Sequence, residues 1–142
     1  YLGFLDIVEE YSITKSANLA YYYSGISFLR LGQYEDAIEY LKQFESDDKM
    51  IAPVAYGAIG DAYMELEDMD DALIFYNKAV NVSENSFTTP IYLMKVAFVY
   101  KQMSNYNKAL EAYKRIEKDF PNTSEGRQVS KYIAQVEVLI QE

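Results

Sequence analysis

The side chains that most often carry out chemistry in proteins are scarce in this chain. Its 142 residues contain no Cys and no His. The usual zinc sites, Ser-His-Asp and Cys-His nucleophilic sites and thiol redox chemistry all require those residues, so the composition excludes them. We therefore expect a protein that is not an enzyme and that binds no cofactor.

One acidic segment, Asp68-Met69-Asp70-Asp71, contains the residue type that binds Ca²⁺. An EF-hand loop that starts at Asp68 needs Gly at its sixth position and Glu at its twelfth, where this sequence has Leu73 and Ala79. Gly57-Ala58-Ile59-Gly60 lacks the Lys-Ser/Thr pair that ends a phosphate-binding loop. Acidic residues at the start of a helix, stabilised by its dipole, are the simpler interpretation of residues 68–71. We predict no metal site.

The acidic residues are unevenly distributed along the chain. Residues 1–71 contain 4 basic and 15 acidic residues, a net charge of −11, whereas residues 72–142 contain 9 and 7, a net charge of +2. An acidic surface repels phosphate backbones, so we expect no nucleic-acid partner. A solvated acidic face is the simplest interpretation. A basic protein partner and head-to-tail self-association are the alternatives.

One spacing pattern recurs three times along the chain. Its copies are Tyr21-x-x-Ser24-Gly25-x-x-Phe28, Tyr56-x-x-Ile59-Gly60-x-x-Tyr63 and Leu93-x-x-Val96-Ala97-x-x-Tyr100. Nine residues after each copy comes an alanine, and four residues later a large residue: Ala37 and Leu41, Ala72 and Tyr76, Ala109 and Tyr113. Residues three and four positions apart share one face of a helix. Each unit therefore predicts two packed helices, which approach closely at the small residues.

Turn residues and prolines mark the predicted ends of these helices. Gly32 suits the left-handed residue that ends a helix, and Asn105 can adopt the same conformation. Thr89-Pro90 offers a capping hydroxyl and a proline at the first helical position, and Pro53 has the same place one repeat earlier. Pro121 closes the third unit. The predicted repeats cover residues 18–49, 53–84 and 90–121.

Both ends of the chain extend the pattern. Three apolar residues near the start match three near the end at a constant offset of 109: Phe4, Ile7 and Tyr11 against Tyr113, Ile116 and Phe120. We therefore expect residues 1–11 to form the second helix of a truncated repeat. From Ser124, a predicted cap, apolar residues recur every three or four positions. We expect residues 124–142 to form a closing helix that covers the last repeat.

The pattern resembles the tetratricopeptide (TPR) repeat, W-x2-L-G-x2-Y…A-x3-F…P, over nearly the whole chain. Ser24, Ala97 and Phe44 depart from it, standing where the repeat usually has Leu, Gly and a small residue. The resemblance implies one all-α domain, residues 1–142, folded as an α-α superhelix (TPR solenoid) of antiparallel helix pairs with a C-terminal closing helix. It also implies a protein-protein interaction scaffold.

In TPR domains the first helix of each repeat lines a concave groove. The resemblance places twelve residues there: Leu19, Tyr22, Ile26, Leu29, Val54, Gly57, Asp61, Met64, Ile91, Met94, Phe98 and Lys101. Co-chaperone TPR domains that hold a peptide carboxylate use Lys, Arg and Asn on this surface, whereas these residues are mainly apolar. We therefore expect the partner to be a hydrophobic peptide or an amphipathic helix, with Met giving adaptable contacts. The alternative is that some of these side chains pack within the core.

Two parts of the sequence are similar to bacterial cell-envelope TPR proteins. Residues 119–125 resemble a short link in periplasmic assembly factors, and residues 60–63 with 87–90 resemble membrane-anchored TPR proteins similar to the ancillary subunit of the Sec translocon. The resemblance implies an envelope assembly or translocation complex, in the periplasm or anchored through an upstream part. No apolar run here is long enough to insert into a membrane. A self-associating structural TPR module, a homo-oligomer, is the alternative.

Overall fold

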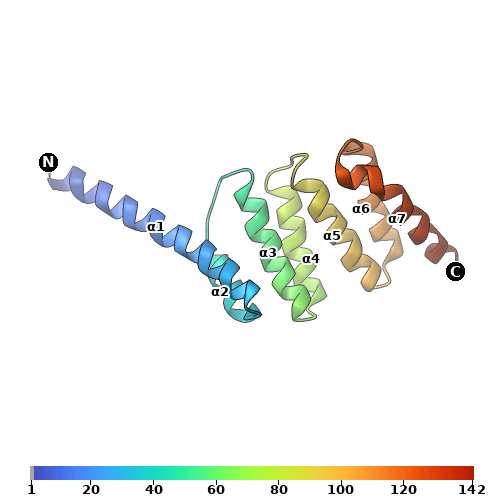
Figure 1. The fold of residues 1–142 in the computed structure, drawn as a ribbon, viewed down its shortest axis with the longest axis horizontal. Helices are drawn as coiled ribbons and strands as arrows, with labels where there is room; N and C mark the ends of the chain where they lie inside the picture. The colour runs from blue at the N-terminus through green and yellow to red at the C-terminus, as the bar shows by residue number, and fades with distance from the viewer. Residues whose placement is uncertain (1) are drawn as a thin grey trace.

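The computed structural model describes residues 2–142, apart from the side chains of Leu2, Phe4 and Val8. These residues form seven α-helices and no strand: α1 Leu2–Arg30, α2 Tyr34–Gln43, α3 Ile51–Glu65, α4 Met69–Asn81, α5 Thr89–Gln102, α6 Tyr106–Asp119 and α7 Ser124–Gln141. Each helix packs against the next in chain order, and the stack extends along one axis (Figure 1). The predicted all-α solenoid of helix pairs is confirmed.

Small residues allow the two helices of a repeat to approach closely. A Cβ added at Gly25 would overlap the Leu41 side chain of α2, and one added at Gly60 would lie 2.6 Å from the Tyr76 ring of α4. Ala97, at the same place in α5, is fully buried. The predicted close approach at these three positions is confirmed.

The turn inside each helix pair contains one left-handed residue. Gly32, with a φ of +77°, has the predicted conformation. The prediction for Asn105 is wrong, because its φ is −91° and Ser104, with a φ of 58°, is the left-handed residue. Asn105 instead caps α6, and its side-chain oxygen accepts a hydrogen bond from the Lys108 backbone N–H at 3.3 Å. The amide side chain is thus used to satisfy a helix N-terminus.

Helices α3 and α5 begin slightly before the positions that the prolines predict. Helix α3 starts at Ile51, which makes Pro53 its third residue, and α5 starts at Thr89, which makes Pro90 its second. Pro is tolerated there because the first-turn N–H groups have no partner within the helix. The Thr89 hydroxyl does not cap its own helix. It accepts a hydrogen bond from the backbone N–H of Asn85 at 2.9 Å.

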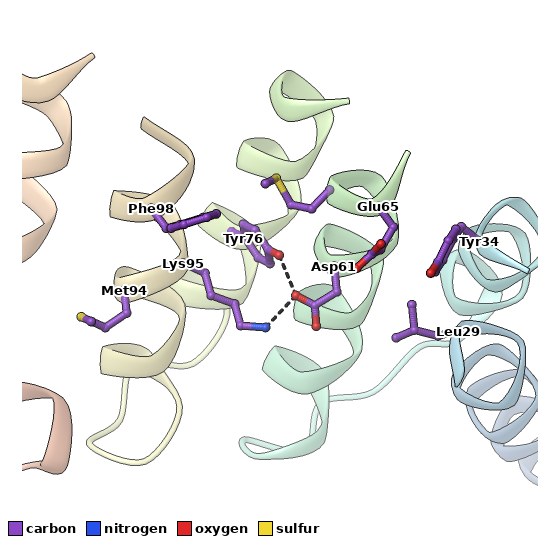
Figure 2. A pocket seen from close by; sticks show the side chains of 9 residues that line it. Leu29, Tyr34, Asp61, Glu65, Tyr76, Met94, Lys95 and Phe98 are labelled. Carbon is purple, nitrogen blue, oxygen red and sulfur yellow. Dashed lines mark hydrogen bonds and ion pairs between the residues drawn. The ribbon is translucent and has the colours of Figure 1, made fainter. Parts of the chain in front are cut away.

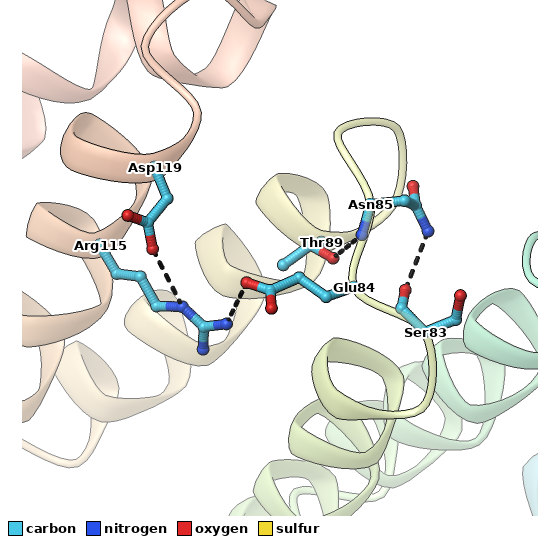
Figure 3. A network of polar contacts seen from close by, with 6 residues as sticks. All are labelled: Ser83, Glu84, Asn85, Thr89, Arg115 and Asp119. Atoms are coloured by element: carbon cyan, nitrogen blue, oxygen red, sulfur yellow. Dashed lines mark hydrogen bonds and ion pairs between the residues drawn. The ribbon is translucent and has the colours of Figure 1, made fainter.

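Polar contacts fix the loop between α4 and α5 (Figure 3). Besides the Asn85–Thr89 bond, the loop is held by α6, where Arg115 donates a hydrogen bond to Glu84 at 2.6 Å. Arg115 also lies 3.8 Å from Asp119 on its own helix. The loop is therefore bonded to both helices of the repeat that follows it, to α5 through Thr89 and to α6 through Arg115.

Helix α7 is the expected closing helix. Its packing face against the last repeat is buried, with Val129, Ile133 and Val136 pointing inward. Tyr132 stacks on Tyr113 of α6, with the ring centroids 5.6 Å apart. The cap is Thr123 and not Ser124, since the Thr123 hydroxyl accepts from the Gly126 N–H at 3.0 Å.

Helix α1 differs from the prediction. Residues 1–11 were expected to form a separate helix, but α1 continues without a break from Leu2 to Arg30 and projects away from the rest of the stack (Figure 1). Prolines stand at or just after the other junctions of this type: Pro53, Pro90 and Pro121. Residues 11–18 contain neither Pro nor Gly, so nothing in this segment interrupts the helical hydrogen bonds.

Several apolar side chains of α1 have no helix over them. Ile7 and Tyr11, which match Ile116 and Phe120 at an offset of 109, are exposed, and the side chain of their companion Phe4 lies outside the described part. Tyr23 is 64% exposed, whereas its counterpart Ala58, one repeat later in α3, is 6% exposed beside α2. No helix of residues 2–142 is long and apolar enough to cross a membrane.

Candidate functional site

A cavity of about 560 Å³ opens along the first helices of the repeats (Figure 2). Most of its lining comes from α3 and α5, with α1, α2 and α4 completing it. Nine residues line it: Leu29, Tyr34, Asp61, Met64, Glu65, Tyr76, Met94, Lys95 and Phe98. We call this cavity the groove. Its position on α3 and α5 follows from the repeat, which turns the same helix face of each unit toward the same side.

The structure brings five of the predicted groove residues together in this cavity: Leu29, Asp61, Met64, Met94 and Phe98. Phe98 is half exposed, and Met64 and Met94 are partly buried against the core. These three side chains leave apolar surface open to a partner. Apolar surface is therefore present at three of the predicted positions, beside the charged Asp61.

Other predicted residues lie elsewhere. Tyr22 and Ile26 pack against the apolar cluster between α2 and α3, and the Tyr22 ring centroid lies 5.0 Å from that of Phe44. Burial raises the pKa of the Tyr22 hydroxyl. Gly57 is buried, and a Cβ there would overlap the Tyr92 ring. These three positions belong to the packing of the repeats, the alternative that the sequence left open.

Four predicted residues lie outside the groove lining: Leu19, Val54, Ile91 and Lys101. Leu19 and Ile91 are exposed, and Val54 and Lys101 are half-buried. All four sit on first helices, as predicted, but toward other parts of that surface. Three of them are apolar and one is a lysine, and none lines the cavity.

Four residues of the groove were missed by the sequence reasoning: Tyr34, Glu65, Tyr76 and Lys95. Tyr34 and Tyr76 belong to second helices, which the repeat assigns to the opposite side, so their reach into the groove depends on side-chain length. Lys95 stands one position after the predicted Met94. Lys95 and Asp61, which lies one repeat earlier, carry opposite charges. That charge pattern is the signal from which their contact could have been predicted.

Asp61 is at the centre of a small polar network (Figure 2). The Tyr76 hydroxyl and the Lys95 ammonium group each donate a hydrogen bond of 2.6 Å to the same carboxylate oxygen. Burial and the hydrogen bond to Asp61 raise the pKa of Tyr76, so this donor keeps its proton. Burial, and after it the Asp61 carboxylate, raise the pKa of Tyr92 to about 12.

The groove offers apolar contacts around a mostly compensated charge. Lys95 pairs with Asp61, while the second carboxylate in the lining, Glu65, has no ion pair within the described residues. The local balance is therefore one negative charge. Residues 2–142 also contain no cluster of His, Cys, Asp or Glu that could hold a metal ion. Such a surface is suited to binding a chain segment.

Comparison of sequences identifies the repeat. Models of the tetratricopeptide repeat match residues 16–86 and 92–123. The chain is 31% identical over 119 residues to the uncharacterized protein ycf37 of Guillardia theta, covering 81% of this chain and 65% of that protein. It is 27% identical over 118 residues to tetratricopeptide repeat protein 29 of Macaca fascicularis, covering 78% of this chain and 25% of that protein. It thus spans only part of each relative.

Two solved structures share the fold. The first TPR of Spaghetti (RPAP3), bound to the HSP90 peptide SRMEEVD, superposes with a TM-score of 0.68 at 17% identity, over 89% of this chain and 95% of that one. MamA superposes with a TM-score of 0.63 at 20% identity, over 87% of this chain and 78% of that one. With the repeat models matching on both sides of residue 90, this chain belongs to the tetratricopeptide repeat family.

Proposed function

We propose that the chain is a protein-interaction scaffold that binds a hydrophobic peptide or an amphipathic helix in the groove. The observation that carries the proposal is the open apolar surface of Met64, Met94 and Phe98 around the Asp61–Lys95 pair. Methionine adapts its shape to different side chains, and an aromatic ring gives a large contact area at a low entropy cost. The likeness to a TPR domain solved with a peptide supports this use of the fold.

The charge in the groove narrows the kind of partner. Glu65 is a carboxylate without an ion pair, whereas the one lysine of the groove is already bonded to Asp61. A basic side chain on the partner can pair with Glu65 at the edge of the apolar surface. An acidic segment, such as the SRMEEVD peptide of the similar structure, would meet repulsion there. We therefore expect apolar segments with a nearby Lys or Arg to be preferred.

A displayed library of random peptides tests this proposal. The protein is used as wild type, as Phe98→Glu, and as Ile74→Glu, a matched control on α4, because both side chains are 50% exposed. We expect the wild type and Ile74→Glu to enrich the same apolar, basic peptides, and Phe98→Glu to lose them. The proposal is wrong if Phe98→Glu enriches the same peptides as wild type, or if acidic peptides dominate the selection.

A second part of the proposal concerns the cellular complex in which this scaffold works. We propose that the scaffold belongs to a bacterial envelope assembly or translocation complex. The support is the resemblance of segments 60–63, 87–90 and 119–125 to proteins of that kind. Fractionation of source cells tests it with an antibody against the chain. Recovery with the membrane or periplasmic fraction is expected, and recovery in the cytosol alone would contradict it.

A self-associating module remains the second candidate, favoured by the exposed apolar side chains of α1. Leu5, Ile7, Tyr11 and Ile13 are all more than half exposed. Sedimentation at low and high salt separates two forms of association. Contact through these side chains persists as salt rises, whereas head-to-tail pairing of the acidic and basic halves weakens. A monomer at both salt concentrations removes this candidate.

A further inference from the structure

A second cavity, of about 570 Å³, lies apart from the groove and shares no residue with it. Helices α2, α3 and α4 form it, together with the segment between α2 and α3. Its lining is Leu41, Lys42, Phe44, Glu45, Ser46, Ala52, Ala55, Tyr56, Ile59, Phe75 and Lys78. We call it the lysine cavity. Its volume falls within the range of roughly 300–1,000 Å³ that is common for small-molecule sites.

The base of the lysine cavity is apolar. Leu41, Ile59 and Phe75 are buried and belong to the apolar cluster between α2 and α4. Phe44 and Tyr56 are half-buried beside them. A molecule in this cavity gains free energy mainly by covering these side chains, so it needs an apolar body.

Two lysines stand over that base. The Lys42 ammonium nitrogen lies 5.3 Å from the centroid of the Phe75 ring, and the Lys78 nitrogen lies 4.6 Å from the same centroid. Lys42 also donates a hydrogen bond of 2.8 Å to the Tyr63 hydroxyl. Each cation is thus held at the cavity lining by a cation–π contact with the same ring.

Neither lysine has an acidic partner. The ion pairs of residues 2–142 involve Lys95, Lys108 and Arg115, and neither Lys42 nor Lys78. Two positive charges in the lining of one cavity attract an anion to it. The lining also contains one carboxylate, Glu45, and Asp71 lies within electrostatic range of Lys42, so the net charge of the lining is +1. The cavity therefore combines an apolar base with a rim of net positive charge.

We propose that the lysine cavity binds a small organic anion with an apolar body, such as an aromatic or acyl carboxylate. The body lies on the Phe75 side and the acid group pairs with the lysines of the lining. Inorganic phosphate lacks the apolar body. The segment that contains Phe44 and Glu45 borders the cavity, and Asn18 hydrogen bonds fix it through the Glu45 backbone at 2.6 and 2.9 Å. A fixed border favours a compact ligand over a peptide, because a peptide chain must extend out of the cavity at both of its ends.

Fluorescence titration with the aromatic sulfonate 1-anilinonaphthalene-8-sulfonate tests this site. The variant is Lys42→Gln with Lys78→Gln, and the control is Lys131→Gln, which removes a lysine held over the Tyr132 ring at 5.1 Å on another helix. We expect the dissociation constant to rise at least about tenfold in the double variant and less than about twofold in the control. Equal affinity of the double variant and wild type would overturn the proposal.

Further measurements separate the contributions of charge and apolar body. Neutral N-phenyl-1-naphthylamine should bind more weakly than the sulfonate and respond to neither substitution; equal binding overturns the role of charge. Decanoate should displace the sulfonate, whereas displacement by inorganic phosphate overturns the role of the apolar body. Displacement by an acidic peptide but not by decanoate would mean a protein partner instead.

Lys78→Arg, which keeps the charge, should retain binding, and this variant decides the outcome if the double variant does not fold.

Discussion

At the scale of single residues, Asp61 has two roles that depend on the same oxygen. It accepts hydrogen bonds from Tyr76 and Lys95, so it joins α3 to both α4 and α5. It also forms the ion pair with Lys95 inside the groove. A buried hydroxyl or amine that loses its acceptor costs more than the bond itself contributes. The network is therefore expected to matter for stability as well as for binding.

Asp61→Ala should lower the free energy of unfolding by roughly 1–3 kcal/mol, because it leaves the Tyr76 hydroxyl without an acceptor. Lys95→Met is the comparison. It keeps the Tyr76–Asp61 bond and should cost less than Asp61→Ala. Urea denaturation followed by circular dichroism measures both. A larger loss for Lys95→Met than for Asp61→Ala would contradict the central position of Asp61.

Stability should fall in strongly alkaline solution, because the pKa of Tyr92 is raised to about 12. In the unfolded chain the same hydroxyl titrates near its ordinary value of about 10, so the unfolded state loses its proton first. The contribution is fully present below about pH 10 and is lost as pH rises toward 12. Denaturation at pH 9 and pH 11 measures the fall. Tyr92→Phe should reduce this pH dependence, and an unchanged slope would contradict the assignment.

At the scale of elements, repeat spacing made most of the fold predictable. The three patterns predicted the helix pairs and the close approach at Gly25 and Gly60, and the apolar periodicity after Ser124 predicted the closing helix α7. The exception is α1, where the pattern of a second helix is present but the junction that would break it is missing. Apolar periodicity identifies the residues whose burial would stabilise the fold. It does not determine whether a chain without Pro or Gly turns back to bury them.

The groove was predictable only in part, for a related reason. Consensus positions located Asp61, Met64, Met94 and Phe98 because backbone geometry repeats. They could not locate Tyr76, whose ring and hydroxyl reach the groove from a second helix. The same limit explains Tyr22, which sits at a groove position but packs on Phe44. Side-chain length and local packing decide such cases, and the repeat pattern contains neither.

The exposed start of α1 should exchange its backbone hydrogens much faster than the rest of the chain. The side chains of residues 3–13 that the structure describes are all exposed, and an isolated helix of this length is marginal in water. Hydrogen exchange with mass spectrometry on the intact protein measures this, with α6 as the internal reference of similar length. Protection equal to that of α6 at micromolar concentration would show that another surface covers this segment.

At the scale of the whole molecule, the solenoid carries two separate surfaces. The groove lies along α3 and α5, and the lysine cavity lies between α2, α3 and α4. Helix α3 contributes to both, Asp61 and Met64 to the groove and Ala52 to Ile59 to the lysine cavity. Because they share no residue, occupation of one should leave the other open. The chain is therefore expected to hold a protein segment and a small anion at the same time.

The central claim is that a partner segment lies in the groove, and the methionines report on it directly. The chain has five methionines, of which Met64 and Met94 line the groove while Met50 and Met103 are exposed elsewhere. A library-selected peptide is titrated into protein labelled with ¹³C at the methionine methyl groups. We predict that the Met64 and Met94 signals shift and that those of Met50 and Met103 stay in place. Shifts at Met50 or Met103 with Met64 and Met94 unchanged would contradict the account.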